Sequence, residues 1–424
     1  MIDARAKFRE LTRVFDPIYQ PRRSAADGPG ASYVPETHAD YRRQLEAALD
    51  LNDNAKLLVA GQPGCGKTTL LLSLADEMRQ AGRLVAFVDL EARTAVQDLN
   101  PVEMYLAAFA ELIAEVAEMG EQGGLSGKLL VRARDWLAQF HVGESSATLR
   151  WLETSLTGLL QLVRNDPGQR GAIWEAMRPG TDGDPCPLLK EALDELVAMR
   201  PVIILDGLDK LQPLHAAQTF LDDKRKPMVE MSGTAILTIP LSVVYEPTFN
   251  VLSERYNNAD SAVLPAVRLW DFKPESRQRV PSAAGIEILR RIVATRVDPI
   301  DPRIVLPDAI ERAIEGSGGN IRELARLMQS SVVKAHVRRG SFVERQDVEA
   351  AIADQRESFR RAFNSSFLPL LQRVRGEYRL EDTSNVAKQL LHGLWIIEYR
   401  NGSAWYSLPE PVEQLLQQME RAAG

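Results

Sequence analysis

The sequence predicts an α/β fold in which a parallel sheet is enclosed between layers of helices. Continuous apolar runs recur along the chain, and segments with apolar residues at helical spacing separate them. Strands buried on both faces have such runs, and their alternation with helices is typical of parallel sheets. A glycine-rich stretch between the first run and the first helix is the third observation, because α/β sheets bind phosphates at such turns.

Five segments are expected to be strands of this sheet. They cover residues 56–60, 84–89, 201–206 and 233–240, with a further short strand at 266–269. An amphipathic helix at 38–51 precedes the first strand and is expected to lie against the sheet.

The stretch GQPGCGKTT fits the pattern G-x-x-x-x-G-K-[ST] and predicts a nucleotide site. Its glycines let backbone N–H groups curl round phosphates, Lys67 reaches the β and γ phosphates, and the Thr68 hydroxyl ligates magnesium. ATP and Mg²⁺ are therefore the expected ligands. The residues expected to line the site are Gly61, Gln62, Pro63, Gly64, Cys65, Gly66, Lys67, Thr68 and Thr69.

The first two thirds of the chain divide into an N-terminal segment and a nucleotide-binding core. Residues 1–40 begin with a charged helical segment and include a Pro/Gly/Ala/Ser-rich stretch, 21–32, that is expected to be flexible. Residues 41–275 form the core. Helical blocks at about 92–182 exceed one crossover helix and predict a helical insertion within it.

The last third divides into a helical domain and a small C-terminal module. Residues 276–355 have helical periodicity throughout, with Asp308 and Asn320 as the expected N-caps. Residues 356–424 follow the order helix, strand, Asn401-Gly402 turn, strand and helix, with the strands at 394–399 and 405–408. This order suggests a winged helix.

The composition indicates a soluble protein of the cytoplasm. The chain has 424 residues, 45% of them hydrophobic and 26% charged, and no apolar run reaches the length of a membrane span. The charged N-terminus is unlike a signal peptide, and two cysteines are too few for a disulfide framework. A net charge of -7 argues against an overall polyanion-binding surface.

Two carboxylates follow the third expected strand. Asp206 ends the apolar run and is the expected magnesium ligand, while Asp209 lies three residues on, where it would accept a hydrogen bond from attacking water. The alternative is a turn-forming Asp-Gly followed by a solvated pair of Asp209 with Lys210. Both interpretations stay open at the sequence level.

The phosphate loop, the DGLDK strand end and the later helices together resemble the AAA+ and STAND superfamily of P-loop ATPases. In most AAA+ members an acidic residue follows the magnesium Asp directly, whereas this chain has Gly207 there. That arrangement is closer to the NACHT-like STAND proteins. The resemblance assigns Thr238, at the end of the fourth strand, to the sensor 1 position; the alternative is a hydroxyl paired locally. STAND proteins often carry an Arg close to this position, whereas the stretch from Leu237 to Pro240 has none.

The resemblance also implies roles for arginines. The stretch GGNIREL is similar to the start of the AAA+ lid helix, in which Arg322 would be sensor 2 and would report phosphate loss as a lid rotation. The alternative is a surface arginine paired with a neighbour such as Glu323. Arg255 is the first candidate for an arginine finger given to a neighbouring copy, and Arg268 is the second.

These features predict an ATP-binding and ATP-hydrolysing switch. ATP would drive homo-oligomer formation, and the signal would pass to separately encoded partners, by analogy in a prokaryotic regulatory or phage-defence system. One alternative is a DNA-binding initiator or transposition-type ATPase that uses the winged helix on duplex DNA. The other is a scaffold that binds nucleotide with little turnover.

The charge of the C-terminal module bears on the DNA alternative. Residues 356–424 contain nine Lys or Arg and eight Asp or Glu, whereas a module that binds the phosphates of DNA is normally more basic. Arg400 and Asn401 lie on the expected wing, and the aromatic residues Trp395, Tyr399, Trp405 and Tyr406 are expected in the core of the module. DNA contact and a packing or partner-binding role stay open.

Reversing the charge of Arg400 tests the DNA alternative. If the wing lies on phosphate, Arg400→Glu weakens duplex binding, and the binding falls steeply with salt because counterions are released. A filter-binding titration at two salt concentrations measures both effects. A duplex affinity that changes neither with the substitution nor with the salt concentration would exclude DNA contact through the winged helix.

Overall fold

The computed structural model describes residues 2–17, 33–95, 99–120, 124–140, 148–211, 227–257, 262–273, 275–276 and 278–423. The described chain forms two compact units. One unit, called the sheet unit here, contains residues 41–60 and 71–263; the other, called the loop unit, contains residues 1–40, 61–70 and 264–424. The expected flexible stretch at 21–32 lies outside the described residues, and the four domains inferred from the sequence stay a prediction.

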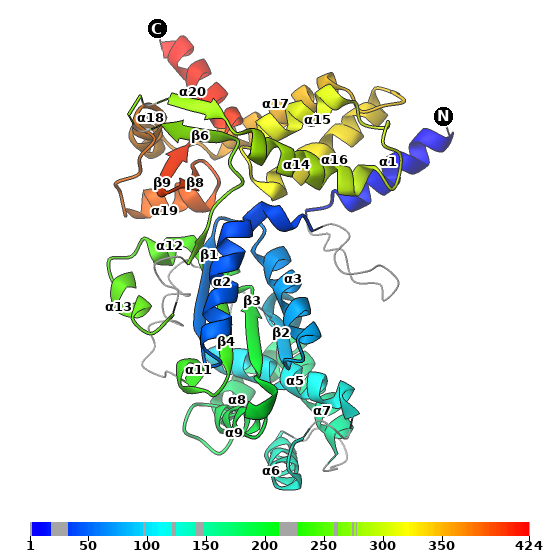
Figure 1. Ribbon diagram of the computed structural model, residues 1–424, viewed down its shortest axis with the longest axis vertical. Coiled ribbons are helices and arrows are strands. Elements are labelled where there is room, and N and C mark those ends of the chain that lie inside the picture. Colours follow the sequence, from blue (N-terminus) through cyan, green and yellow to red (C-terminus); the bar gives the residue numbers. More distant parts are fainter. Residues whose placement is uncertain are drawn as a thin grey trace. The chain divides into compact units, whose positions relative to one another are not determined.

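The sheet unit is built on a five-stranded sheet with the order β2-β3-β4-β1-β5 (Figure 1). Strand β2 pairs in parallel with β3, and β3 pairs in parallel with β4, so the predicted α/β class is confirmed. Four of the five expected strands form close to their predicted bounds. The strands are β1 Lys56–Gly61, β2 Val85–Asp89, β3 Val202–Asp206, β4 Thr234–Pro240 and β5 Val263–Leu264.

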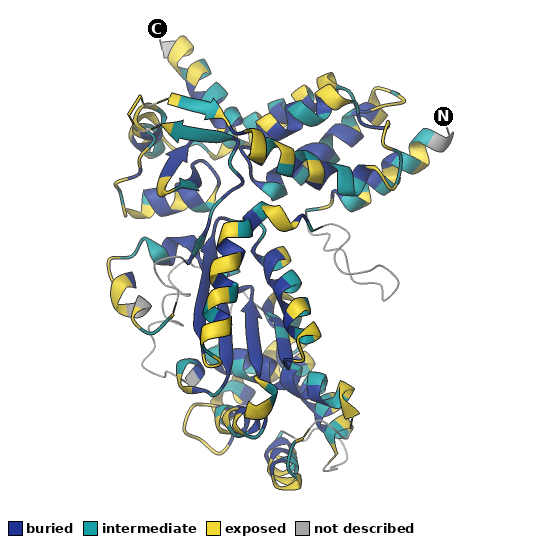
Figure 2. Ribbon diagram, viewed as in Figure 1, coloured by how far each residue is buried: buried dark blue, intermediate teal, exposed yellow. Residues whose placement is uncertain are grey.

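The strands are buried because apolar side chains fill both faces of the sheet. Strands β1, β3 and β4 are buried along their whole length (Figure 2). Helix α5 (Pro101–Glu118) packs on β2 and β3, so the first helical block of the expected insertion covers the sheet itself. Helix α2 (Ala39–Leu51) is held by Tyr41, whose hydroxyl donates to the carbonyl oxygen of Ala262 at 2.8 Å.

The remaining helices of the sheet unit include the rest of the expected insertion. Buried Glu103 of α5 accepts hydrogen bonds from Arg170 at 3.0 Å and from the indole of Trp174 at 2.6 Å, which ties α8 to α5. The other elements are α3 Lys67–Gln80, α4 Leu90–Arg93, α6 Gly127–Ala138, α7 Leu149–Asn165, α8 Pro167–Ala176, α9 Cys186–Glu195, α11 Pro227–Glu230, α12 Leu241–Val244 and α13 Phe249–Ser253, with 3-10 turns at Val197–Met199 and Leu208–Lys210.

The loop unit contains four helices, together called the helical domain here, over residues that the sequence predicts to be mostly helical. They are α14 Ala283–Val297, α15 Pro307–Gly316, α16 Ile321–Val337 and α17 Arg345–Ala362. Helix α1 (Ile2–Val14) lies alongside them (Figure 1). Its Phe8 and Leu11 belong to the hydrophobic core that these helices form. Asn320 caps α16 as expected, but Leu306 rather than Asp308 is the N-cap of α15, because that helix begins at Pro307, two residues earlier than expected.

The C-terminal module follows the predicted order of elements. The β8–β9 hairpin turns at Gly402, and its register pairs Asn401 with Ser403. Buried Arg312 of α15 ties the module to the helical domain through a 2.6 Å ion pair with Glu410 of α20, and it also pairs at 2.6 Å with Glu349 of α17 within the helical domain. The elements are the 3-10 turn Ser365–Phe367, α18 Leu368–Glu377, α19 Asn385–His392, β8 Ile397–Asn401, β9 Ser403–Ser407 and α20 Glu410–Ala423.

The expected strand at 266–269 is wrong. The fifth strand of the sheet is Val263–Leu264, and the residues after it bond within the loop unit instead. The N–H of Ala266 donates to the Glu398 carbonyl oxygen at 3.2 Å, and that of Val267 to the Gly319 carbonyl oxygen at 3.1 Å. These partners lie far along the chain, so local hydrophobicity did not reveal them.

A second hairpin, which the sequence analysis missed, precedes the helical domain. It pairs β6 (Trp270–Lys273) with β7 (Gln278–Pro281) and packs on the C-terminal module. The ring of Phe272 stacks on Trp405, with 5.5 Å between ring centroids, and the Arg279 guanidinium lies over the ring of Tyr378. The alternation of Trp270 and Phe272 with polar residues was the available sequence signal.

Two helical glycines in the loop unit test how tightly it is packed. A Cβ at Gly285 of α14 would lie 1.7 Å from the Arg268 carbonyl oxygen, whereas a Cβ at Gly376 of α18 would meet nothing within 4 Å. Gly285→Ala should therefore lower the free energy of unfolding by about 2 kcal/mol. Gly376→Ala, the matched control, should raise it by about 0.5 kcal/mol. Urea denaturation measures both, and a Gly285→Ala variant as stable as the wild type would contradict this packing.

Candidate functional site

The phosphate loop connects β1 to α3, as the sequence predicts. The backbone of the loop requires glycine at two positions, because both have a positive φ and one of them also has no room for a Cβ. Gly64 has a φ of +82°, and a Cβ there would lie 2.3 Å from the Cβ of Arg322 and 2.6 Å from the Asn320 Oδ1. Gly66 has a φ of +105°, which also disfavours a side chain. A side chain at residue 64 would thus push away the first turn of α16.

Groups from elsewhere in the loop unit hold three consecutive carbonyls of the loop. Asn320 Nδ2 donates to the Pro63 oxygen at 2.8 Å, and the N–H of Arg322 donates to the Gly64 oxygen at 3.2 Å. The Nε2 of His38 lies 2.8 Å from the Cys65 oxygen, and because a carbonyl only accepts, the ring nitrogen carries the proton. The loop backbone is therefore fixed from two sides, by the N-terminal segment and by α16.

This bonding pattern fits a phosphate ligand. In a planar peptide unit the C=O and the N–H point in opposite directions. Because the carbonyls of Pro63 and Cys65 point to Asn320 and His38, the N–H groups of Gly64 and Gly66 point away from Asn320 and His38, respectively. Backbone N–H groups of a glycine-rich turn are suited to bind an anion, and α3 begins at Lys67 directly after this turn.

Lys67 is buried and positioned by its own loop. Its Nζ donates to the Gly61 oxygen at 2.9 Å and to the Gln62 oxygen at 3.1 Å, and the residue is 5% exposed. The ammonium charge is thus held against the loop, where the sequence predicts phosphate. Thr68 is half-buried and Thr69 is exposed.

The two candidate carboxylates lie together in the sheet unit. Asp206 ends β3 and is 3% exposed. Gly207 then takes a φ of +108°, and the 3-10 turn Leu208–Lys210 places half-buried Asp209 in its first turn. Lys210, in the same turn, forms an ion pair with Glu91.

Thr238 connects β4 to the end of β3. Its hydroxyl accepts the N–H of Gly207 at 2.9 Å and donates to the Leu205 carbonyl oxygen at 3.4 Å, and the residue is fully buried. The local pairing that the sequence left open is therefore present. It holds the turn that carries Asp206 and Asp209.

The candidate arginines belong to different units. Arg322 is half-buried at the start of α16, and its backbone rather than a side-chain bond is what contacts the loop. Arg255 is half-buried in the turn after α13, in the sheet unit. Arg268, the second candidate for a finger, pairs with Asp271 at 3.1 Å.

Sequence reasoning missed the contacts that hold the loop. It identified Asn320 as a helix cap, and the cap is real because the Oδ1 accepts the N–H of Glu323 at 3.1 Å. The second role of Asn320, and the whole role of His38, depend on tertiary contacts. The GGN sequence before α16 was the available signal for Asn320, whereas nothing in the local sequence marks His38.

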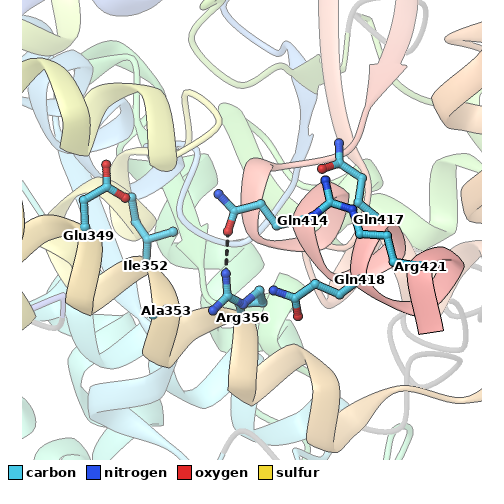
Figure 3. Close-up of a pocket in the computed structure, with 8 residues that line it drawn as sticks. All are labelled: Glu349, Ile352, Ala353, Arg356, Gln414, Gln417, Gln418 and Arg421. Atoms are coloured by element: carbon cyan, nitrogen blue, oxygen red, sulfur yellow. Dashed lines mark hydrogen bonds between the residues drawn. The ribbon is translucent and has the colours of Figure 1, made fainter.

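The described part of the loop unit also contains cavities away from the phosphate loop. Figure 3 shows one of about 240 Å³ between α17 and α20, where Arg356 and Gln414 point toward each other and bond at 2.9 Å. Over the described ranges, no cluster of three His, Cys, Asp or Glu has the arrangement of a metal site. Among those same residues, no helix has the length and apolar character to span a membrane.

Comparisons with known proteins agree with the motif. A model of the KAP family P-loop domain matches residues 44–221, less than half of the chain. A search of curated proteins found no match. The chain is therefore similar over this range to a P-loop NTPase domain, and the sheet, the phosphate loop and this match together assign a nucleotide-binding domain to it.

Several solved structures are similar over nearly the whole chain. Cdc6p from Pyrobaculum aerophilum has 12% identity and a TM-score of 0.39, covering 96% of each chain. The Aeropyrum pernix ORC1 protein, in complex with DNA, has 16% identity and a TM-score of 0.39, covering 97% of each. The Aeropyrum pernix ORC2 protein, in ADPNP-ADP complexes, has 14% identity and a TM-score of 0.40, covering 96% of each. At these sequence identities and TM-scores, the activities and partners of those proteins are not transferred to this chain.

The buried histidine predicts a pH dependence of stability. Burial lowers the pKa of His38 from 6.5 to about 4, although its bond to Cys65 opposes the shift. In the unfolded chain the ring takes up a proton near pH 6.5. The contribution of neutral His38 is therefore present above that pH and is lost as the pH falls toward 4, by about 3 kcal/mol in all. Urea denaturation between pH 7 and 4 should show this loss in the wild type.

His38→Gln supplies the comparison, because the glutamine amide keeps a donor for the Cys65 oxygen and has no proton to gain. Its stability should fall less over the same pH range. His336→Gln, at an exposed position of α16, is the matched control and should retain the wild-type dependence. Equal pH profiles for all three proteins would contradict the burial of His38.

Proposed function

We propose that this chain is an ATP-binding and ATP-hydrolysing switch of the AAA+/STAND type, in which the helical domain acts as a lid. The bonding of α16 to the phosphate loop carries the proposal. The Asn320 side chain and the Arg322 N–H bond directly to loop carbonyls. A ligand that reshapes the loop would therefore disturb or strengthen these bonds, and the change would be transmitted to α16.

The loop residues grip the phosphate chain in this proposal. The N–H groups of the glycine-rich turn bind phosphate oxygens, and the Lys67 ammonium neutralises the β and γ phosphates. Thr68 from the loop and Asp206 from β3 are assigned as magnesium ligands. Bound Mg²⁺ would supply charge neutralisation on the β and γ oxygens. An oxygen-donor pair of a hydroxyl and a carboxylate suits this hard cation.

The chemistry is assigned to the turn after β3. Asp209 accepts a hydrogen bond from the attacking water and orients it, and Thr238 keeps Asp206 and Asp209 in place through its bond to Gly207. The Arg322 side chain stabilises charge on the γ-phosphate as sensor 2. Because the base is displaced from the residue directly after Asp206, we expect slow turnover in the isolated chain.

Assembly completes the switch. ATP would favour homo-oligomers in which Arg255 reaches the site of a neighbouring copy, and separately encoded partners would receive the signal. A prokaryotic regulatory or phage-defence system suits such a chain by analogy alone. The C-terminal module, of winged-helix type, serves packing within the chain in this proposal, since Trp395, Tyr399, Trp405 and Tyr406 are 2–8% exposed and offer no stacking surface.

Solution mass and phosphate release together test this function. With magnesium and a slowly hydrolysed ATP analogue the wild type should assemble, whereas with ADP or no nucleotide it should not. Lys67→Ala should weaken nucleotide binding about 10- to 100-fold and abolish assembly, because a charge-assisted contact to phosphate is lost. Light scattering after size exclusion measures the mass.

Asp209→Asn separates hydrolysis from binding. It should lower phosphate release about 100-fold while nucleotide affinity is retained, because only the orientation of water is affected. If wild-type release is already negligible and Asp209→Asn leaves it unchanged, the chain is a nucleotide-binding scaffold and not an ATPase. A monomer in every nucleotide state would remove the role of Arg255.

A further inference from the structure

The side chain of Gln62, the second residue of the phosphate loop, bonds to the C-terminal module. Its Nε2 donates to the carbonyl oxygens of Leu391 at 2.8 Å and Ile396 at 2.7 Å, and its Oε1 accepts the N–H of Glu398 at 2.8 Å. The residue is 2% exposed. Both ends of one amide are therefore engaged with a single short segment of the module, at the end of α19 and the start of β8.

This segment depends on the glutamine for its own bonding. Leu391 lies in the last turn of α19, and its carbonyl oxygen also accepts the N–H of Leu394 at 3.3 Å. Ile396 and Glu398 are buried. Buried backbone groups without a hydrogen bond are costly, about 1–3 kcal/mol each. The contact is therefore specific, because an apolar side chain of similar size would remove the hydrogen bonds that Gln62 makes to the Ile396 carbonyl oxygen and the Glu398 N–H.

The backbone of the same residue contacts the phosphate-binding lysine. The Gln62 carbonyl oxygen accepts the Lys67 Nζ at 3.1 Å and the Cys65 N–H at 3.2 Å. One residue thus joins the module to the ammonium group that the proposed function assigns to phosphate.

A second contact supports the same connection from the other side of the loop. The Tyr399 hydroxyl of β8 donates to the Gly318 carbonyl oxygen at 2.5 Å. Gly318 lies two residues before Asn320, which holds the Pro63 oxygen. Strand β8 is therefore connected to the loop directly through Gln62 and indirectly through the start of α16.

We infer that Gln62 is a positioning residue through which the C-terminal module holds the phosphate loop in its binding conformation. The inference rests on the proposed function, that this loop binds ATP. A loop already fixed in its bound form loses less conformational freedom on binding, so the module should strengthen nucleotide affinity. Coupling between two binding events is reciprocal. Bound nucleotide should therefore strengthen the attachment of residues 391–398 by the same factor.

Two readouts test the coupling. The first is equilibrium binding of a fluorescent ATP analogue with magnesium, and the second is hydrogen exchange over residues 394–400, which include the Glu398 amide. In the wild type, saturating nucleotide should slow exchange in this segment. Gln62→Glu keeps the size of the side chain but sets a carboxylate against the Leu391 and Ile396 oxygens. It should weaken nucleotide binding about tenfold and remove the nucleotide effect on exchange.

Asn401→Ala is the matched control. It removes another amide-to-carbonyl bond of the module, from Asn401 Nδ2 to the Phe272 oxygen at 3.1 Å, without touching the loop. Its nucleotide affinity should equal that of the wild type.

Three results would overturn the inference. One is a Gln62→Glu variant that binds nucleotide within about twofold of the wild type. Another is a rate of hydrogen exchange over residues 394–400 of the wild type that does not change when saturating nucleotide is added. This measurement needs no variant, so it tests the inference even if Gln62→Glu fails to fold. A wild type that binds no nucleotide would refute the proposed function itself, and the binding readout distinguishes that failure from the other two.

Discussion

The phosphate loop depends on donors that lie outside it. Asn320, the Arg322 N–H and His38 fix the directions of three consecutive carbonyls, and the loop N–H groups take the opposite directions in consequence. A single such bond contributes only about 1 kcal/mol net, but breaking one in a buried setting leaves a polar group unsatisfied. The anion-binding shape of the loop is therefore a property of the loop unit as a whole and not of nine consecutive residues.

The residues assigned to phosphate binding and those assigned to hydrolysis belong to different compact units. The groups assigned to gripping phosphate, including Lys67, belong to the loop unit, whereas Asp206, Asp209 and the supporting hydroxyl of Thr238 belong to the sheet unit. Each set is positioned by bonds within its own unit, as the hydrogen bond from the Gly207 N–H to Thr238 illustrates.

The C-terminal module is integrated into the loop unit by three kinds of contact. Aromatic stacking of Phe272 on Trp405 joins it to the β6–β7 hairpin, the ion pair of Arg312 with Glu410 joins it to the helical domain, and Gln62 joins it to the phosphate loop. The stacking buries apolar surface and adds to stability, whereas the attraction within the partly buried ion pair is opposed by the cost of removing its charges from water. The amide bonds of Gln62 demand a defined geometry, which makes them the contact best suited to sense the state of the loop.

The sequence by itself determined the features that local patterns encode. Apolar runs and helical spacing predicted the α/β class, four of the five strands, the helical domain and the final hairpin, and the glycine spacing predicted the phosphate loop. Only the tertiary structure decided what holds that loop, because Gln62 and Leu391 are 329 residues apart and their bond joins a side chain to a backbone carbonyl. A backbone carbonyl is present in every residue, so no residue type marks it as a partner. The misplaced strand at 266–269 has the same cause, since the partners of Ala266 and Val267 are carbonyls that the fold brings from distant segments.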